Sequence, residues 1–257
     1  MNILILRPKK DALELMHKLN KINIQSWIFP IFKFRPGKDL FLLPHVLQSS
    51  SKNSIVIASS KYAILYSHNY LKKIKKWPIT LNYFAIGHKS ARLLKICTKK
   101  KVLYPLKKEN SEHLIKVIKK TKPIKDTKII ILQGNNSRNI LAKELSNDGY
   151  NIVKLECYQR IFIRYNGSKE AKKWKFFNIN MLIVTSSEML TRLTCIFYKK
   201  KEKRWLFKCK ILCISNRIYT LALSLGWKNI IICSHAHNAC ILKKIKEIYD
   251  NGRRKRI

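Results

Sequence analysis

Acidic side chains are scarce in this chain of 257 residues, in which 14 Asp and Glu stand against 54 Lys and Arg. So few carboxylates leave no apparent pair for acid–base catalysis. Glycine and proline are also few, with 7 of each, which excludes a collagen-like or linker-rich architecture. No apolar run approaches the ~20 residues of a membrane span. We therefore expect no part of the protein to lie in a membrane.

Several common functional motifs are missing. Neither GxGxxG nor GxxxxGK[ST] occurs, so nucleotide binding lacks its usual phosphate cradle, and no GxSxG marks a serine hydrolase. The seven cysteines are odd in number and include no CxxC pair. Cys233, His235, His237 and Cys240 lie close together, but their spacing fits no standard zinc pattern. We expect neither a metal nor an organic cofactor.

The apolar stretch before Arg7 is only four residues long, which is too short for the core of a signal peptide. A reduced, cytoplasmic protein is the simplest interpretation.

Hydrophobic residues make up 46% of the chain, enough for real cores. The formal net charge of +40 suits a polyanionic partner such as nucleic acid. Lys, Ile and Asn are abundant together, however, and drift toward A- and T-rich codons would produce the same excess, so charge alone does not identify the partner.

Short β-branched runs alternate with helical patterns, which indicates an α/β fold with parallel sheets. The run at 55–58 and its helix are matched by the run at 181–184 and its helix, an offset of 181 − 55 = 126 residues. Other runs match at nearly the same offset, so the second half of the chain repeats the first. The further pairs are 3–6 with 128–132, 22–29 with 151–155, 83–87 with 211–215, and 101–104 with 229–233.

Two similar α/β domains with parallel sheets follow from this duplication. Segments 33–37 and 160–167 occupy corresponding places and look like extended connectors with turn residues. If the chain crosses between domains at both, one domain is inserted into the other and a cleft with a flexible floor lies between them. We expect a first domain at 1–36 and 164–250, an inserted domain at 37–163 and a basic tail at 251–257.

The residues directly after the strands are the candidates for binding, because ligands of open α/β sheets bind at the carboxyl ends of the strands. They are rich in hydroxyls, amides and cations. Each hydroxyl taken alone is more easily explained as a helix cap, but their recurrence in both copies favours an anion-binding cleft. The set comprises Arg7, Ser59, Ser60, Lys61, Ser90, Gly134, Asn135, Arg138, Thr185, Ser186, Ser187 and Arg217.

Tyr158 follows the strand at 151–155 in the second copy, where the chain leaves for the second connector. A phenol there can donate a proton as a general acid. An aromatic plug at the domain junction is an equally good explanation of its position.

Eight stretches together resemble the uroporphyrinogen-III synthase family, the bacterial branch in particular. Their order, spacing and number carry the resemblance over nearly the whole chain. They are ILILRP at the N-terminus, YFAIGHKSARLL (83–94), LYP (103–105), SEHL (111–114), ILQGNNSRNIL (131–141), LECYQR (155–160), VTSSEML (184–190) and LALSLGW (221–227).

The resemblance implies two α/β domains joined by a two-stranded ladder, with the active site in the cleft between them. It implies a lyase without metal or cofactor, which turns hydroxymethylbilane into uroporphyrinogen III by losing water, closing the macrocycle and inverting ring D through a spiro intermediate. The substrate carries eight carboxylates, which an acid-poor cleft suits. A monomer is expected, with transient handover from hydroxymethylbilane synthase.

The same resemblance suggests roles for single residues. Tyr158 matches the family's tyrosine and is the candidate for protonating the departing hydroxyl. Ser90 matches a hydroxyl that hydrogen-bonds substrate, and Arg7 and Arg138 match recurring arginines. Backbone N–H groups at 134–135 and 185–187 match loops that hold the carboxylate arms. Two departures stand out: Leu6 replaces the usual threonine before Arg7, and Ser215-Asn216-Arg217 replaces a threonine-rich loop.

Overall fold

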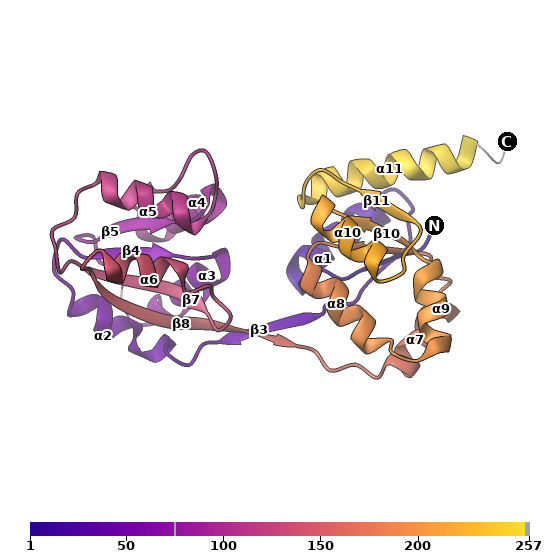
Figure 1. Ribbon diagram of the computed structural model, residues 1–257, viewed down its shortest axis with the longest axis horizontal. Coiled ribbons are helices and arrows are strands. Elements are labelled where there is room, and N and C mark those ends of the chain that lie inside the picture. Colours follow the sequence, from indigo (N-terminus) through magenta and orange to yellow (C-terminus); the bar gives the residue numbers. More distant parts are fainter. Residues whose placement is uncertain (75, 255–257) are drawn as a thin grey trace. The chain divides into compact units, whose positions relative to one another are not determined.

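The computed structural model describes residues 1–74 and 76–254, the side chains of 252–254 excepted. It divides into two compact units, of which the first contains Met1–Lys33 and Phe162–Ile257 and the second contains Phe34–Ile161. Each unit is a sheet with helices on both faces (Figure 1).

The first unit has a parallel sheet in the order β11-β10-β9-β1-β2. Its strands are short and mostly apolar, and the central strands β1 and β9 are fully buried, as expected for a sheet covered by helices on both faces. The strands are β1 (Ile3–Ile5), β2 (Ser26–Ile28), β9 (Met181–Val184), β10 (Lys210–Cys213) and β11 (Ile230–Ile232). The helices are α1 (Lys9–Asn20), α7 (Gly167–Phe176), α8 (Ser187–Ile196), α9 (Lys200–Lys208), α10 (Asn216–Ser224) and α11 (Asn238–Arg254).

Two apolar clusters hold this unit together. On one face, α1 and α11 pack side by side, and Leu15 and Ile245 meet the inward side chains of β1 and β9. The other face is covered by α7, α8, α9 and α10, whose residues surround Trp174 and Trp227. Because successive side chains of a strand point to opposite faces of the sheet, the same short strands contribute residues to both clusters.

The second unit has a six-stranded sheet in the order β3-β8-β7-β4-β5-β6. The pairs from β8 to β6 are parallel. The strands are β3 (Phe32–Pro36), β4 (Ile55–Ala58), β5 (Asn82–Ala85), β6 (Val102–Leu103), β7 (Lys128–Gly134) and β8 (Asn151–Phe162). The helices are the 3₁₀ turn η1 (Leu40–Leu42), α2 (Leu43–Gln48), α3 (Lys61–Leu71), α4 (His88–Thr98), α5 (Ser111–Lys120) and α6 (Ile140–Asn147).

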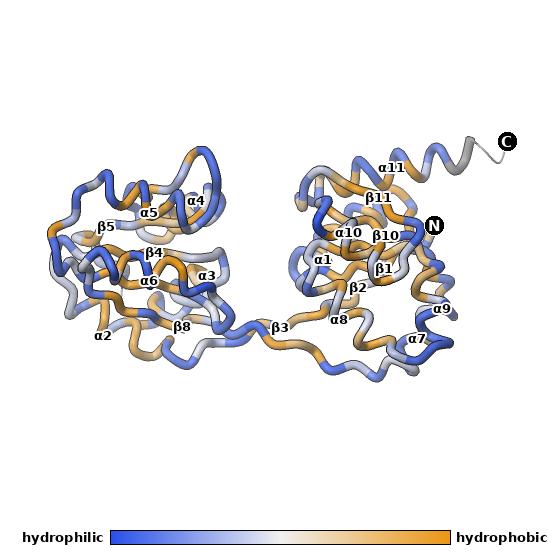
Figure 2. The backbone as a smooth tube through the Cα atoms, in the orientation of Figure 1, coloured by the Kyte–Doolittle hydropathy of each residue, from blue (hydrophilic) through white to orange (hydrophobic). Residues whose placement is uncertain are grey.

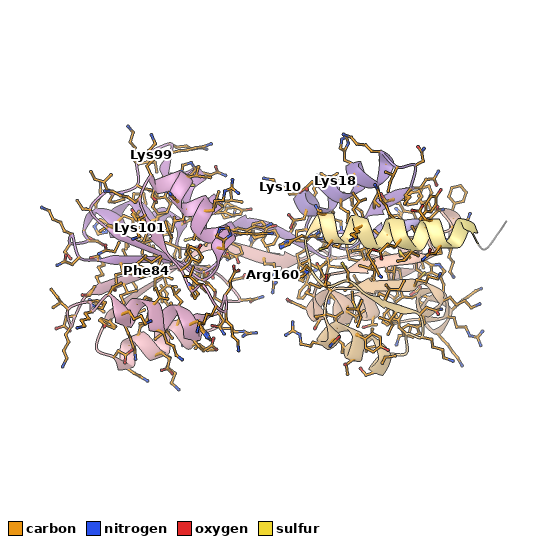
Figure 3. All side chains as sticks on the ribbon, turned by 90° about the horizontal axis from the view of Figure 1, so that it is seen from above. Lys10, Lys18, Phe84, Lys99, Lys101 and Arg160 are labelled. Atoms are coloured by element: carbon orange, nitrogen blue, oxygen red, sulfur yellow. The ribbon has the colours of Figure 1, made fainter. Side chains whose placement is uncertain are left out.

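This unit also has one cluster on each face of its sheet. Helices α2, α3 and α4 bury Leu43, Ile64 and Leu94 on one side, and α5 and α6 bury Leu114 and Leu145 on the other. The strands form the hydrophobic interior of each unit (Figure 2). Phe84 is buried in the sheet, whereas the cations Lys99 and Lys101 are exposed (Figure 3).

The two sheets have the same strand order once the sequence repeat is taken into account. The repeat pairs β1 with β7, β2 with β8, β4 with β9, β5 with β10 and β6 with β11. Under this pairing the order β2-β1-β9-β10-β11 equals β8-β7-β4-β5-β6. The predicted α/β class with two similar parallel sheets is therefore confirmed. Leaving the connector strand β3 aside, each unit takes two strands from one repeat and three from the other.

Two strands differ in length from the sequence interpretation. The run expected at 22–29 is a strand only at Ser26–Ile28, because the chain turns at Asn23, whose φ is 56°. The run expected at 151–155 continues to Phe162 as β8. The boundaries between the units fall within β3 and at the end of β8, which are neighbours in the second sheet.

Residues 251–254 of the expected basic tail belong to α11. Residues 255–257 lie outside the described part of the chain. Within residues 1–74 and 76–254, every helix is too short or too polar to span a bilayer.

Candidate active site

The strand order places a switch point at the centre of each sheet, where successive crossover connections leave in opposite directions and ligands of α/β proteins bind. In the second unit this point lies between β7 and β4, and in the first between β1 and β9. The residues that follow these four strands are 135–138, 59–61, 7–8 and 185–187. Most of the candidate residues therefore lie at the two switch points.

A β-bulge in β8 directs the Tyr158 side chain toward the switch point of the second unit. Along the β7–β8 pair, Gln133 faces Glu156 but the next residue, Gly134, faces Tyr158, so Cys157 is the extra residue. Consecutive strand residues normally point to opposite faces. Here Cys157 and Tyr158 both join the cluster beneath α3, because the bulge turns the strand between them.

The absence of a side chain at Gly134 leaves the space that the Tyr158 ring occupies. A Cβ at residue 134 would lie 2.5 Å from Cζ and 2.8 Å from the phenolic oxygen of Tyr158. Beyond Gly134, the Asn135 backbone N–H donates to the Tyr158 carbonyl at 3.2 Å, and its side-chain oxygen accepts from the Arg160 N–H at 2.9 Å. Asn135 thus continues the pairing past the end of β7 and fixes the backbone that carries the tyrosine.

Ser60 connects this tyrosine to a helix N-terminus. Its hydroxyl caps α3 by accepting from the Ala63 N–H at 3.2 Å and donates to the Tyr158 oxygen at 3.1 Å. The neighbouring Ser59 donates its backbone N–H to Leu132 across the sheet. Lys61 places its ammonium 5.1 Å from the centre of the Tyr62 ring. The partial positive charge at the N-terminus of α3 and the Lys61 charge favour an anion next to the phenol.

Aromatic rings surround Tyr158 on the side toward α3. Phe34 and Tyr62 stack at 3.9 Å, and each lies 5.8 Å from the Tyr158 ring. Tyr66, one turn further along α3, lies 6.2 Å away. These rings restrict the motion of the Tyr158 side chain and leave its hydroxyl end at the polar edge of the sheet.

The start of α4 differs from the starts of α3, α8 and α10, each of which is capped by a serine side chain. Gly87 occupies the cap position and offers no side chain, and the carboxylate of Glu109 accepts the His88 N–H at 3.0 Å instead. Glu109 fits because residue 87 has no Cβ; one there would lie 2.4 Å from its oxygen. Ser90 lies half-buried in the same first turn. One of the few acids of the chain thus occupies a position suited to a substrate carboxylate.

In the first unit, the loop after β9 repeats the arrangement at β4. Ser186 caps α8 by accepting from the Met189 N–H at 3.2 Å, as Ser60 caps α3. Thr185 lies half-buried beside it, 3.7 Å from the Met189 sulfur. The Ser187 hydroxyl is buried without a hydrogen-bond partner in the described part of the chain. The three hydroxyls lie together at the N-terminus of α8.

Arg7 is held inside the first unit. Its guanidinium donates to the side-chain oxygen of Asn238 at the start of α11 and lies 4.0 Å from the Asp11 carboxylate. Hydrogen bonds from Lys18 and Asn238 lower the pKa of Glu14, with a smaller contribution from the Arg7 charge. Arg7 therefore links β1 to α1 and α11, and its side chain is only 11% exposed.

The other two arginines of the candidate set are exposed. Arg138 lies in the loop after β7, and Arg217 lies in the first turn of α10, beside the Ser215 cap. Both are accessible to a large anionic ligand from solvent.

The histidines and cysteines near the start of α11 do not form a metal site. His235 lies 3.0 Å from the Ser234 hydroxyl and 4.0 Å from the Cys240 sulfur, and its ring stacks on His237. Among the residues that the structure describes, no three His, Cys, Asp or Glu side chains are arranged to hold a metal ion.

Sequence reasoning missed Glu109 and Asn238. Comparison of the two repeats contained a signal for the first, because Gly87 stands where the other copy has the capping Ser215. Nothing local to Asn238 indicated that it would bind an arginine more than 200 positions earlier.

The two units define a class of protein: a duplicated α/β protein whose strand ends carry hydroxyl-capped helix N-termini suited to anions. A family model described as uroporphyrinogen-III synthase HemD matches residues 14–243. The uroporphyrinogen-III synthase of Escherichia coli K12 is 33% identical over 247 residues, covering 96% of this chain and all of the relative. That of Proteus mirabilis is 31% identical over 75% of this chain and 97% of the relative.

Solved structures support the fold. A mutant uroporphyrinogen III synthase from Thermus thermophilus aligns over 98% of this chain and 99% of its own, with a TM-score of 0.64 and 12% identity. The uroporphyrinogen-III synthetase of Helicobacter pylori 26695 aligns over 96% and 99%, with a TM-score of 0.60 and 13% identity. The chain belongs to the uroporphyrinogen-III synthase family, a family of hydro-lyases in tetrapyrrole biosynthesis.

Proposed function

We propose that the protein converts hydroxymethylbilane into uroporphyrinogen III and that Tyr158 is the general acid of the reaction. The observation that carries the assignment of Tyr158 is its setting: a bulged strand and Gly134 place its phenol beside the N-terminus of α3. Among the residues described above at this edge, Glu109 is the acid that accepts a helix N–H, from His88 at the start of α4.

The substrate binds through its carboxylates. The first turns of α3 and α8 offer backbone N–H groups whose partial positive charge favours anions. The exposed Arg138 of the second unit and Arg217 of the first unit each add a full positive charge. Backbone donors of this kind hold a carboxylate without requiring a particular side chain.

The chemistry begins with protonation of the substrate hydroxyl by Tyr158. The proton passes from the phenolic oxygen to the hydroxyl oxygen, the carbon–oxygen bond breaks, and water leaves. The electron pair of the pyrrole nitrogen stabilises the resulting azafulvene cation. Ring D attacks this cation at its substituted carbon, which leads to the spiro intermediate and inversion. A proton lost from a pyrrole carbon in the final step restores the phenol, so protons balance over the cycle.

The proposal takes the protein as a monomer in the cytoplasm that receives its substrate from hydroxymethylbilane synthase. All seven cysteines are free thiols, which suits a reducing compartment. Direct handover suits a substrate that cyclises without an enzyme to the type I isomer.

The test is a coupled assay in which porphobilinogen and its deaminase generate hydroxymethylbilane with and without this protein. The porphyrin isomers are separated after oxidation, and predominantly type III product is expected. Folded protein that leaves only the type I isomer would contradict the proposal and favour a basic protein that merely binds polyanions.

Tyr158→Phe tests the assignment of the acid. It is expected to lower kcat by about 10²-fold or more with little change in KM, because the ring and its packing remain and only the proton donor is lost. Tyr150→Phe is the matched control, since Tyr150 directly precedes the opposite end of the same strand and packs under α5 and α6. Equal kcat values for the two variants would argue against Tyr158 as the acid.

A further inference from the structure

The Ser60 hydroxyl is fully engaged inside the second unit. Its oxygen accepts the Ala63 N–H at 3.2 Å, which caps α3, and its proton is donated to the phenolic oxygen of Tyr158 at 3.1 Å. The backbone at Ser60 is extended, with φ −160° and ψ 163°, as a helix cap requires. Ser60 thus acts on another side chain rather than presenting its proton to a ligand.

The direction of this hydrogen bond decides where the Tyr158 proton points. A phenolic oxygen prefers to keep its proton in the plane of the ring, with a lone pair on the opposite side in the same plane. A donor that occupies the lone pair leaves the proton on the other side. With Ser60 as donor, the Tyr158 proton is directed away from α3 and remains available to a substrate hydroxyl.

The ring cannot easily escape this arrangement. Gly134 leaves room for it on one side, where any Cβ would come within 2.5 Å of Cζ. Tyr62 and Phe34 hold it on the other, each with a ring centre 5.8 Å away. The Ser60 hydroxyl is fixed in turn because it belongs to the first turn of a helix.

We propose that Ser60 is a positioning residue that fixes the direction of the Tyr158 proton and stabilises the phenolate left after its transfer. This inference rests on the proposed function, in which Tyr158 is the acid. The Ser60 hydrogen bond becomes charge-assisted as the proton leaves, so it strengthens in the transition state more than in the ground state. The N-terminal dipole of α3 acts in the same direction.

The experiment is a double-mutant cycle on kcat with Ser60→Ala, Tyr158→Phe and the combination of both. Ser60→Ala is expected to lower kcat about 10- to 100-fold with KM changed less than about twofold. In the Tyr158→Phe background the same substitution is expected to change kcat less than about twofold, because Ser60 then has no phenol to orient. Ser60→Thr keeps a hydroxyl cap and is expected to retain most of the activity.

Two further variants separate positioning from the loss of a helix cap. Asn110→Ala removes the cap of α5 in the same unit, where Asn110 accepts the His113 N–H at 3.0 Å, and is expected to leave kcat unchanged. Ser60→Asp keeps α3 capped but offers only acceptors, so it draws the Tyr158 proton toward itself. A folded Ser60→Asp protein is therefore expected to show a decrease in kcat similar to that of Ser60→Ala.

The outcomes separate failure of the proposed function from failure of the positioning role of Ser60. Wild-type protein that yields only the type I isomer overturns the proposed function, and this inference with it. Type III product from the wild type, with an equal loss from Ser60→Ala in both backgrounds, overturns the positioning role alone. A rise in KM without a fall in kcat also overturns it, because that result marks Ser60 as a direct substrate contact.

Discussion

Tyr158 lies directly against Gly134, so closely that a methyl group at residue 134 would stand 2.5 Å from the Cζ atom of the ring. Gly134→Ala is therefore expected to displace the phenol and to lower kcat by about 10-fold or more, while the unit stays folded. Measured kcat for type III formation, with a circular dichroism spectrum to confirm the fold, tests this expectation. Unchanged turnover would show that the observed ring position is not the catalytic one.

Gly149→Asn provides the matched control for that substitution. Gly149 has φ +85° and nothing within 4 Å of an added Cβ, and asparagine tolerates this backbone conformation better than other residues. Its kcat is expected to equal that of the wild type.

Glu109 occupies the N-terminus of α4 with its carboxylate. Glu109→Gln is expected to lower KM for hydroxymethylbilane, because removal of the charge weakens repulsion of the substrate carboxylates. The cost is about 0.3–1 kcal/mol of stability, from the lost interaction with the helix dipole. Glu112→Gln, in the exposed first turn of α5, removes the same charge elsewhere and is expected to leave KM unchanged. A higher KM for Glu109→Gln would mean that the carboxylate orders the site instead of blocking it.

Arg7 and Arg217 are expected to respond differently to the same substitution. Arg7→Met breaks the bonds to Asn238 and Asp11, so we expect a loss of about 2 kcal/mol and a Tm lower by several degrees. Arg217→Met removes an exposed charge and is expected to raise KM about threefold without lowering Tm. Thermal unfolding and steady-state kinetics on both variants test the distinction. A raised KM with an unchanged Tm for Arg7→Met, and a lowered Tm for Arg217→Met, would instead assign Arg7 to substrate binding.

The buried thiols predict a dependence of stability on pH. Burial raises the pKa of Cys157 and of Cys209 to about 12. In the unfolded chain these thiols ionise near pH 9, so above that value the unfolded state releases protons that the folded state retains. The free energy of unfolding is therefore expected to fall as pH rises from about 9 toward 12, by up to about 1.4 kcal/mol per pH unit for each thiol. Urea unfolding at pH 8 and pH 10.5 measures the change, and Cys157→Ala should reduce it. An identical change in that variant would assign the effect to other groups.

Much of the fold follows from local pattern. Runs such as Ile55–Ala58 and Met181–Val184 are too apolar for a surface and too short for a helix, and the residues after them supply the helix caps. The nearly constant offset between the two repeats then indicates which strand of the first repeat matches which strand of the second. The start of β2 was missed because the chain turns at Asn23, and the end of β8 was missed because β8 continues along β7 to Tyr158 and also lies beside β3.

The candidate site was accessible to sequence reasoning only as a set of positions after strands. That Ser60 would donate to Tyr158 depends on the bulge at Cys157, which no single-residue signal marks. That Arg7 would turn into the unit depends on Asn238, which lies at the far end of the chain. Long-range packing decides these side-chain directions, whereas the spacing of residues decides only which of them reach the strand ends.

The exchange of strands between the repeats has a consequence for how the chain is put together. A cut between α5 and β7 separates the two repeats cleanly in sequence, yet it divides both sheets: the connector strand β3 aside, each fragment keeps two strands of one and three strands of the other. Neither half can bury its apolar faces alone, and each supplies what the other lacks. A half-length chain with this strand order would complete its two sheets only by exchanging segments with a second copy of itself.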